Sequence, residues 1–238
     1  MRLIRAKTDK KDAQVIAKYG AEQSPEPWRP AEPAMLAMQQ ILMVPDGLKR
    51  QTTIASNQLE SLKSTGIMDD QILKSLSRVL ENLHEQVGVL EDKLDDLISK
   101  TCSETVTRIE KITGIGRKTA VLLTVATQNF TRFNNSRQLI AFAGFSSRIY
   151  QSGSSVGGKG HICKMGNGHL RKLLYMCAWS AKKCNPQCPE MYNRLKAIGK
   201  PEKVIKVAIA NKLIRQAFAI ARNKLEYQSD FLNPKFAF

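Results

Sequence analysis

One short segment of this chain, Gln151 to Ser155, has the residue types for covalent chemistry, because it holds three serines around a glycine. A serine hydroxyl attacks phosphorus when it is held in line with the leaving group and nearby cations compensate the developing charge. Arg148 precedes the segment and Lys159 follows it. The simpler alternative is a glycine-rich loop that only contacts phosphate. The residues themselves leave both interpretations open.

Two carboxylates near the N-terminus have the spacing of a metal-binding pair. Asp9 and Asp12 lie three residues apart at a predicted helix start, so both side chains lie on one face of one turn. Mg²⁺ prefers carboxylate oxygens, and phosphoryl-transfer sites use such pairs to hold it. Acidic residues also occur in the first turn of a helix for capping alone. The spacing therefore allows either a magnesium role or a structural one.

The serine segment lies in a long stretch without negative charge. Lys111 to Pro189 contains twelve Lys and Arg and no Asp or Glu. Residues 1–110 carry 15 basic and 17 acidic side chains, and the whole chain has a formal charge of +16. Apolar runs interrupt the basic stretch, so it is not a disordered tail. A folded surface of this composition indicates nucleic-acid binding, because Lys and Arg near phosphates release condensed counterions.

A glycine pair joins two predicted helices inside this stretch. Gly114 and Gly116 are spaced as in a helix-hairpin-helix element. Glycines let backbone approach backbone, and free N–H groups at the start of the second helix bind phosphate without reading bases. Arg117 and Lys118 follow directly and are candidates to assist. The alternative is an ordinary helix C-cap glycine followed by a tight turn.

The elements that must position these groups are nearly all helical. Helices are predicted over residues 7–19, 35–44, 48–64, 69–100, 103–112, 117–127, 136–142, 169–183 and 202–224. Pro45-Asp46-Gly47 predicts a turn that separates the second helix from the third. Strand signals are confined to residues 148–151 and to a hairpin that ends near Gly160. The predicted fold class is therefore mainly α.

The clearest apolar pattern runs from Asp69 to Lys100. Three- and four-residue steps alternate through Leu73, Leu76, Leu80, Leu83, Val87, Leu90, Leu94 and Leu97. This spacing predicts a coiled coil. Its surface is acidic, which favours pairing with another helix over contact with DNA. We expect the partner helix in a second copy of the chain, as a homo-oligomer; the alternative is a hairpin within one chain.

Cysteine usage and hydropathy indicate the cellular compartment in which the protein is expected. The five cysteines have no disulfide-framework spacing, no secretory apolar region follows Met1, and no run is long enough to span a bilayer. These features predict a cytoplasmic protein without a membrane partner. Cys184-x-x-x-Cys188 is weak as a zinc pattern, because lone thiols usually behave as small buried hydrophobes.

Several motifs, taken in order, resemble one known family. They are Arg5-Ala-Lys-Thr-Asp9-Lys-Lys-Asp12-Ala13, Gly114-Ile115-Gly116-Arg117-Lys118-Thr-Ala, Ala141-Phe-Ala-Gly144, and the long run from Gln151-Ser152-Gly153 through Ile162, Lys164 and Gly166 to Leu170-Arg171 and Leu174-Tyr175. Together they resemble the insertion-sequence transposases related to the pilin-gene invertase, which are bridge-RNA-guided serine recombinases. The resemblance covers nearly the whole chain.

The resemblance implies a domain order and a set of roles. It implies an N-terminal RNase H-like (RuvC-like) domain with four acidic metal ligands, then a coiled coil, then a transposase domain with a catalytic serine. By motif match, Asp9 and Asp12 are the last two ligands for Mg²⁺, and Ser152 is the nucleophile. We expect three domains. Residues 1–34 would form the end of the RuvC-like domain and a linker, and residues 35–100 would form a coiled-coil oligomerisation region. Residues 101–238 would form a mostly helical, DNA-binding transposase domain. The nucleic-acid-binding residues expected from the basic stretch are Gly114, Gly116, Arg117, Lys118, Arg148, Lys159, Lys164 and Arg171.

The chain departs from the family at its start. The family's first Asp and its Glu lie on strands that should precede Asp9, and only eight residues stand before it. We therefore expect an N-terminally truncated transposase whose complete form cuts and rejoins DNA through Ser152, in DNA transposition directed by a guide RNA. The alternative is a non-catalytic, oligomerising, nucleic-acid-binding remnant of such a protein. A helix-hairpin-helix repair protein fits less well, because it explains neither the serine motif nor the coiled coil.

Overall fold

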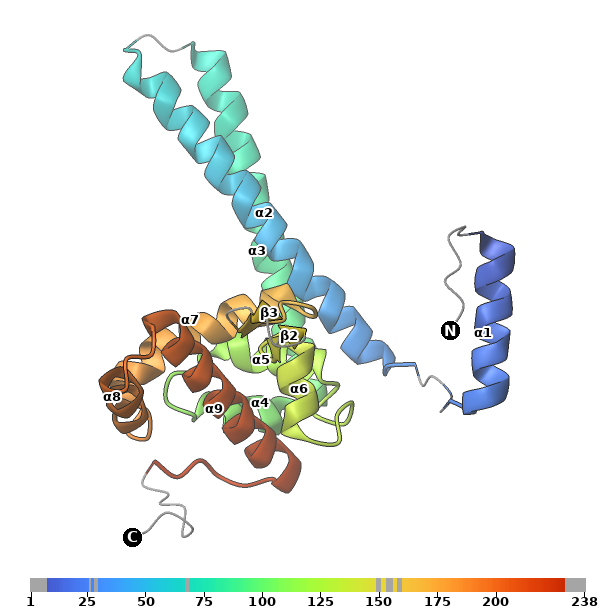
Figure 1. Cartoon of the computed structure of the whole chain (residues 1–238). Coiled ribbons are helices and arrows are strands. Elements are labelled where there is room, and N and C mark those ends of the chain that lie inside the picture. Colours follow the sequence, from blue (N-terminus) through green and yellow to red (C-terminus); the bar gives the residue numbers. More distant parts are fainter. Residues whose placement is uncertain are drawn as a thin grey trace. The chain divides into compact units, whose positions relative to one another are not determined.

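The computed structural model describes residues 8–25, 27, 30–66, 69–148, 151–152, 156–157 and 160–229. The chain divides into two compact units, residues 1–31 and 32–238. The described part is mainly helical, as predicted (Figure 1). Its helices are α1 (Asp9–Gln23), α2 (Pro33–Ser64), α3 (Asp70–Thr101), α4 (Ser103–Glu110), α5 (Arg117–Ala126), α6 (Ser136–Phe142), α7 (Gly168–Cys184), α8 (Pro189–Ala197) and α9 (Glu202–Asn223). Its strands are β1 (Ser147–Arg148), β2 (Gln151–Ser152), β3 (Val156–Gly157) and β4 (His161–Ile162).

The first unit contains one helix, α1, within its described residues. Thr8 caps its start, because the hydroxyl oxygen accepts a hydrogen bond from the N–H of Lys11. The helix ends at Ser24, which has a left-handed φ of 42°. None of the described side chains of α1 is buried, and Val15, Ile16 and Tyr19 are more than half exposed. The helix thus leaves an apolar stripe uncovered.

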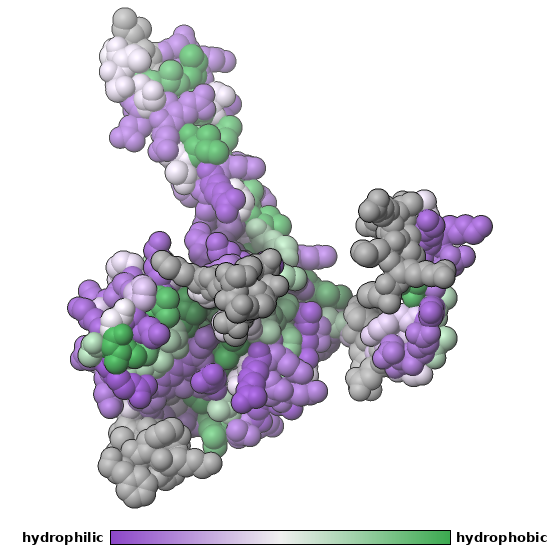
Figure 2. Space-filling model, in the orientation of Figure 1, coloured by the Kyte–Doolittle hydropathy of each residue, from purple (hydrophilic) through white to green (hydrophobic). Residues whose placement is uncertain are grey.

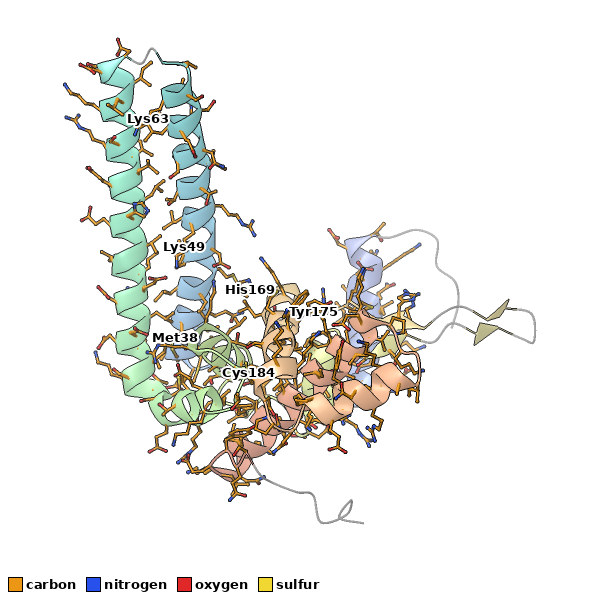
Figure 3. All side chains as sticks on the ribbon, turned by 90° about the vertical axis from the view of Figure 1, so that its left-hand side faces the viewer. Met38, Lys49, Lys63, His169, Tyr175 and Cys184 are labelled. Atoms are coloured by element: carbon orange, nitrogen blue, oxygen red, sulfur yellow. The ribbon has the colours of Figure 1, made fainter. Side chains whose placement is uncertain are left out.

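The second unit begins with a long helical hairpin formed by α2 and α3 (Figures 1 and 3). All eight apolar positions predicted in α3 are buried or half-buried. The facing stripe of α2 consists of Met35, Met38, Ile41, Leu42, Pro45, Leu48, Thr52, Ala55, Leu59 and Leu62. The seam of α3 is therefore filled by a helix of the same chain, which is the alternative that the sequence left open.

The predicted turn at Pro45-Asp46-Gly47 is wrong. α2 continues through Pro45, whose side chain is buried. A proline inside a helix costs about 3 kcal/mol, because it removes one N–H and crowds the preceding turn. Here the buried stripe continues on both sides of Pro45, through Ile41 and Leu48, so packing against α3 outweighs that local cost. Asp46 is further held by Lys118 of α5.

Helices α4 to α9 surround one hydrophobic core. Every residue of α5 from Thr119 to Ala126 is buried, so this helix lies at the centre. α9 packs against α7 and α8 as well as α4 and α6. Met35 and Met38 of α2 belong to the same core, and Figure 3 shows Met38 at the root of the hairpin. The hairpin is therefore anchored in the helical body.

One helix, α8, lies outside the predicted set. None of the described side chains of α8 is fully buried, and its only half-buried apolar residues after the initial proline are Met191, Tyr192 and Leu195, so the apolar signal of this short helix is weak. Pro189 occupies its first turn, where a missing N–H costs nothing. Among the described residues, none of the helices combines the length and apolar composition needed to cross a membrane.

Candidate nucleic-acid interface

Ser152 lies in a β-hairpin between α6 and α7, called the serine hairpin below (residues 147–162). β1 pairs with β4 in the antiparallel register Ser147↔Ile162, and β2 pairs with β3 in the register Ser152↔Val156. The hairpin indicated by the sequence is thus present. Ser154, Ser155 and Lys159 lie outside the described residues, and of Ser152 only the backbone is described.

Arg171, in the first turn of α7, fixes the root of the serine hairpin. Its Nη1 atom donates hydrogen bonds to the carbonyl oxygens of Ala143 at 3.1 Å and Lys164 at 3.0 Å. These bonds join the end of α6 to the residues that follow β4. Arg171 was expected to contact nucleic acid; that contact stays a prediction, and the hydrogen bonds give the residue a structural role as well.

Two glycines allow this close junction. Gly166 has a φ of +118°, and a Cβ there would lie 2.1 Å from the carbonyl oxygen of Phe142. Gly144 has a φ of +76°, and a Cβ there would lie 2.3 Å from Nη1 of Arg171. At both positions the positive φ and the lack of room for a Cβ atom exclude other residue types. The N–H of Lys164 also donates to the carbonyl of Gly144, at 3.1 Å. The root of the serine hairpin is therefore closely packed.

The turn between α4 and α5 contains the glycine pair that suggested a helix-hairpin-helix element. Gly114 has a φ of +104°, and a Cβ there would lie 2.6 Å from Cβ of Ala181 in α7. Asn185 supports the turn by donating from Nδ2 to the carbonyl of Thr113 at 2.8 Å. Gly116 is the N-cap of α5 and has open space around its Cα. Gly114 thus serves packing, while Gly116 leaves the start of α5 accessible.

The two cations that follow this turn are paired with carboxylates of the α2–α3 hairpin. Nη2 of Arg117 lies 2.8 Å from Oδ1 of Asp95, and Nζ of Lys118 lies 2.6 Å from Oδ1 of Asp46. The hydrogen bond that Arg117 donates to Asp95 raises the pKa of Arg117, and the one that Lys118 donates to Asp46 lowers the pKa of Asp46. Their expected phosphate contacts stay predictions. In the structure they tie the start of α5 to both helices of the hairpin.

Asp46 is the residue of this site that sequence reasoning missed. Its second carboxylate oxygen lies 3.5 Å from Nδ1 of His169, an ion pair only when the imidazole is protonated. Asp46 therefore links α2 to both α5 and α7. A turn was predicted at this position, so no signal pointed to an ion pair there.

Other cations of the basic stretch remain exposed and unpaired. In the described part of the chain, six of them have no ion pair and are solvent-exposed: Arg132, Arg137, Arg148, Lys164, Lys172 and Lys183. They come from the residues before α6, from α6, from β1, from the segment between β4 and α7, and from α7. Two of the predicted contacts, Arg148 and Lys164, are in this group and lie at the root of the serine hairpin. Their charge is available to an anionic partner.

Asp9 and Asp12 lie in the first turn of α1, and both are exposed. Thr8 already supplies the helix cap, so the two carboxylates are not needed for capping. Carboxylates one turn apart fit a Mg²⁺ ion as a partial ligand set. The described residues contain no group of three or more side chains suited to hold a metal. A magnesium role for the pair therefore stays a prediction.

Comparison with known proteins supports one family. A family model described as "Transposase IS116/IS110/IS902 family" matches residues 106–193, which include the serine hairpin. The pilin gene-inverting protein of Moraxella bovis is 30% identical over 222 residues, which cover 92% of this chain and 67% of that protein. The insertion element IS110 uncharacterized 43.6 kDa protein of Streptomyces coelicolor is 28% identical over 214 residues, 90% of this chain and 50% of that protein. The transposase for insertion sequence element IS1328 of Yersinia enterocolitica is 28% identical over 194 residues, 72% of this chain and 58% of that protein.

Proposed function

This chain belongs to the IS116/IS110/IS902 family of transposases, and we propose that it acts in DNA transposition by binding DNA and supplying a serine nucleophile. One observation carries the proposal. Arg171 fixes the serine hairpin, and the unpaired cations Arg148 and Lys164 lie at its root, while the exposed Lys172 follows Arg171 in α7. A phosphate drawn to these cations would lie beside the segment that contains Ser152.

The proposed reaction is attack by the hydroxyl of Ser152 on a backbone phosphorus. A bond forms between Oγ and phosphorus, and the bond from phosphorus to a deoxyribose oxygen breaks; the proton of Ser152 ends on the leaving oxygen. A hydroxyl of another strand end then attacks the same phosphorus, the bond between phosphorus and Oγ breaks, and the proton of that hydroxyl ends on Oγ of Ser152. Cations at the hairpin root compensate charge on the phosphate oxygens during both steps.

The acidic pair has a separate part in this proposal. Asp9 and Asp12 would help to hold Mg²⁺, with further ligands that the described residues do not supply. When bound, the ion compensates charge on the attacking and leaving oxygens. We place α1 in a RuvC-like domain, residues 35–100 in a coiled-coil arm, and residues 101–238 in the transposase domain, whose turn at Gly114 acts as a helix-hairpin-helix element. A guide RNA as a further partner is supported by the resemblance alone.

Self-association is also part of the proposal, but it needs a surface other than the α2–α3 seam. Several large apolar side chains of the hairpin remain exposed: Ile54 at 66%, Ile72 at 46%, Val79 at 47% and Val89 at 54%. A second copy could cover these positions. This assignment is supported by their exposure and by the acidic surface of α3, which disfavours DNA there.

The proposed DNA binding is tested by removing positive charges at and next to the root of the serine hairpin. The triple variant Arg148→Gln, Lys164→Gln, Lys172→Gln should bind duplex DNA more weakly and with a weaker salt dependence. The slope of log K against log salt is negative. If all three side chains contact phosphate, its magnitude should decrease by about 2.7. Fluorescence anisotropy over a salt series measures both quantities.

A matched control removes the same charge elsewhere. Lys63→Gln, Lys74→Gln, Arg78→Gln changes three exposed, unpaired cations of the α2–α3 hairpin. Figure 3 shows Lys63 near the tip of that hairpin, far from its root. The control should bind DNA like the unmodified chain. Equal weakening by both triple variants would mean that net charge alone binds DNA, and the proposed surface would be wrong.

A further inference from the structure

A hollow on the surface of α7 is not used by the proposed reaction. Its volume is about 500 Å³, and it is lined by Tyr175, Met176, Trp179, Ser180, Lys183 and Cys184. Figure 3 labels Tyr175 and Cys184, the first and last of these residues. Met176 is 57% exposed and Trp179 is 48% exposed. In Figure 2, apolar residues coloured green lie among purple ones over the region where Figure 1 shows α7 and α8.

Trp179 is held in place by a buried cation. Nζ of Lys206, in α9, lies 3.4 Å from the centroid of the indole ring and 5.9 Å from that of Tyr175. Lys206 is only 4% exposed, and its ammonium lies 3.5 Å from a carboxylate oxygen of Glu202. A buried ammonium is retained when aromatic faces and a carboxylate stabilise it. Lys206 lies over one face of the indole, and about half of Trp179 remains exposed to another group.

The charge around the hollow is positive. Glu202 is already engaged by Nζ of Lys182 at 2.8 Å and by the hydroxyl of Tyr192 at 2.7 Å. Lys183, which lines the hollow, is exposed and has no ion pair in the described part of the chain. A fixed, half-exposed indole beside a free ammonium suits a flat aromatic group that carries an anion. A nucleobase with its phosphate has that chemistry, and stacking on aromatic side chains tolerates every base.

We propose that this hollow binds an unpaired base of a DNA strand, with the base on Trp179 and an adjacent phosphate at Lys183. The inference rests on the proposed function, since a protein that opens DNA strands exposes unpaired bases. We assign DNA because the relatives are named for transposition and gene inversion. A base inside a duplex has no free face for the indole, so the site should prefer single strands.

The chain offers a direct optical test. It contains two tryptophans, Trp28 and Trp179, so Trp28→Phe leaves Trp179 as the single tryptophan reporter. In this background, a short thymidine oligonucleotide should quench the tryptophan emission saturably, while a duplex of equal length should bind without comparable quenching. This readout requires no change at the hollow itself, so it does not depend on a variant that fails to fold.

A substitution at the hollow gives the second readout. In the otherwise unmodified chain, Trp179→Ala should weaken binding of the single strand by about tenfold or more and leave duplex affinity unchanged within about twofold. Ile198→Ala is the matched control, because Ile198 is 63% exposed at the end of α8 and does not line the hollow. It should change neither affinity.

The possible outcomes separate this inference from the proposed function. Quenching by single strands in a chain that binds no duplex would support the hollow and contradict the proposed DNA surface. Duplex binding without any quenching by single strands would overturn the hollow alone. Tighter, Trp179-dependent binding of an RNA oligonucleotide would overturn the assignment to DNA. Emission that changes with protein concentration but not with oligonucleotide would show that a second copy covers Trp179, and the proposal would be wrong.

Discussion

Nζ of Lys118 in α5 lies 2.6 Å from Oδ1 of Asp46 in α2, although the two residues are 72 positions apart in the sequence. Beside this pair, Arg117 lies 2.8 Å from Asp95 of α3. The two cations best placed to bind phosphate at the start of α5 are therefore occupied by carboxylates of the α2–α3 hairpin. A DNA phosphate at this turn must compete with those carboxylates.

Freeing the two cations should strengthen DNA binding. Asp46→Asn together with Asp95→Asn releases Lys118 and Arg117, so duplex affinity should rise. Both pairs are partly exposed, and each is worth at most about 1 kcal/mol, so the rise should be less than about tenfold per pair. Anisotropy titrations at fixed salt measure it. Glu60→Gln with Glu81→Gln, which removes the same charge from exposed hairpin positions, should have a smaller effect. An equal rise in both variants would indicate a long-range charge effect only.

The junction that holds the serine hairpin should tolerate no side chain at Gly166. Gly166→Ala combines a φ of +118° with a Cβ 2.1 Å from the carbonyl of Phe142. We expect it to lower the free energy of unfolding by about 2–4 kcal/mol. Denaturant unfolding measures this change. Unchanged stability would show that α6 and α7 do not meet as described.

Gly47 provides the opposite case, because it lies inside α2 and has no heavy atom near its missing Cβ. Gly47→Ala should raise the free energy of unfolding by about 0.5–1 kcal/mol, since alanine favours a helix interior. The same unfolding experiment tests it. A loss of stability would favour a turn at residues 45–47, and so contradict the continuous α2 helix.

The pH dependence of stability should report Glu202. A hydrogen bond from Lys182, with a second from Tyr192, lowers the pKa of Glu202 from 4.5 to about 2. A carboxyl whose pKa is lower in the folded state stabilises the fold at pH values above its unfolded pKa. This contribution is lost as the pH falls from about 4.5 towards 2. Glu202→Gln should therefore flatten the fall of Tm over that range.

The control for this measurement is Glu190→Gln, which changes an exposed glutamate of α8 without an ion pair among the described contacts. Its Tm should follow the unmodified chain as the pH falls. Parallel Tm curves for Glu202→Gln and the unmodified chain would show that the Lys182–Glu202 pair contributes nothing to folding. The effect should be modest, because the side chain of Glu202 is 42% exposed.

Local signals account for the elements that the sequence predicted well. α3 begins at the cap Asp69, and α6 and α7 begin at the caps Asn135 and Asn167. Each cap precedes a periodic apolar run, so the sequence alone determines where these helices start. The glycine and serine pattern between α6 and α7 likewise predicted the serine hairpin.

Long-range packing accounts for what the sequence could not give. The stripe of α2 contains Pro45 and Thr52 at seam positions, which hid its match to α3 and favoured a turn. The partners of Arg117 and Lys118 lie 22 and 72 residues away. Composition showed that these cations exist, but only the folded structure shows which carboxylates hold them. For Arg171, similarly, the motif did not reveal its bonds to the carbonyls of Ala143 and Lys164.

The proposed serine chemistry uses Mg²⁺, and two carboxylates on one helical turn hold that ion weakly. With Asp9 and Asp12 as the proposed ligands, we expect the 238-residue chain by itself to form no adduct with DNA. A fusion to the part of the Moraxella bovis relative outside the matched region tests whether that part completes the proposed site. Incubated with Mg²⁺ and a labelled, pre-nicked DNA, this fusion should form a covalent protein–DNA adduct.

The most direct test of Ser152 as the nucleophile is denaturing gel electrophoresis of that reaction. Mass spectrometry of the DNA-linked peptide then identifies the modified residue. We predict an adduct on the peptide that contains Ser152, absent in Ser152→Ala and retained in Ser155→Ala. Binding of the DNA by Ser152→Ala should be unchanged, which separates chemistry from affinity. An adduct that survives Ser152→Ala, or one that disappears in Ser155→Ala instead, would contradict the assignment of Ser152 as the nucleophile.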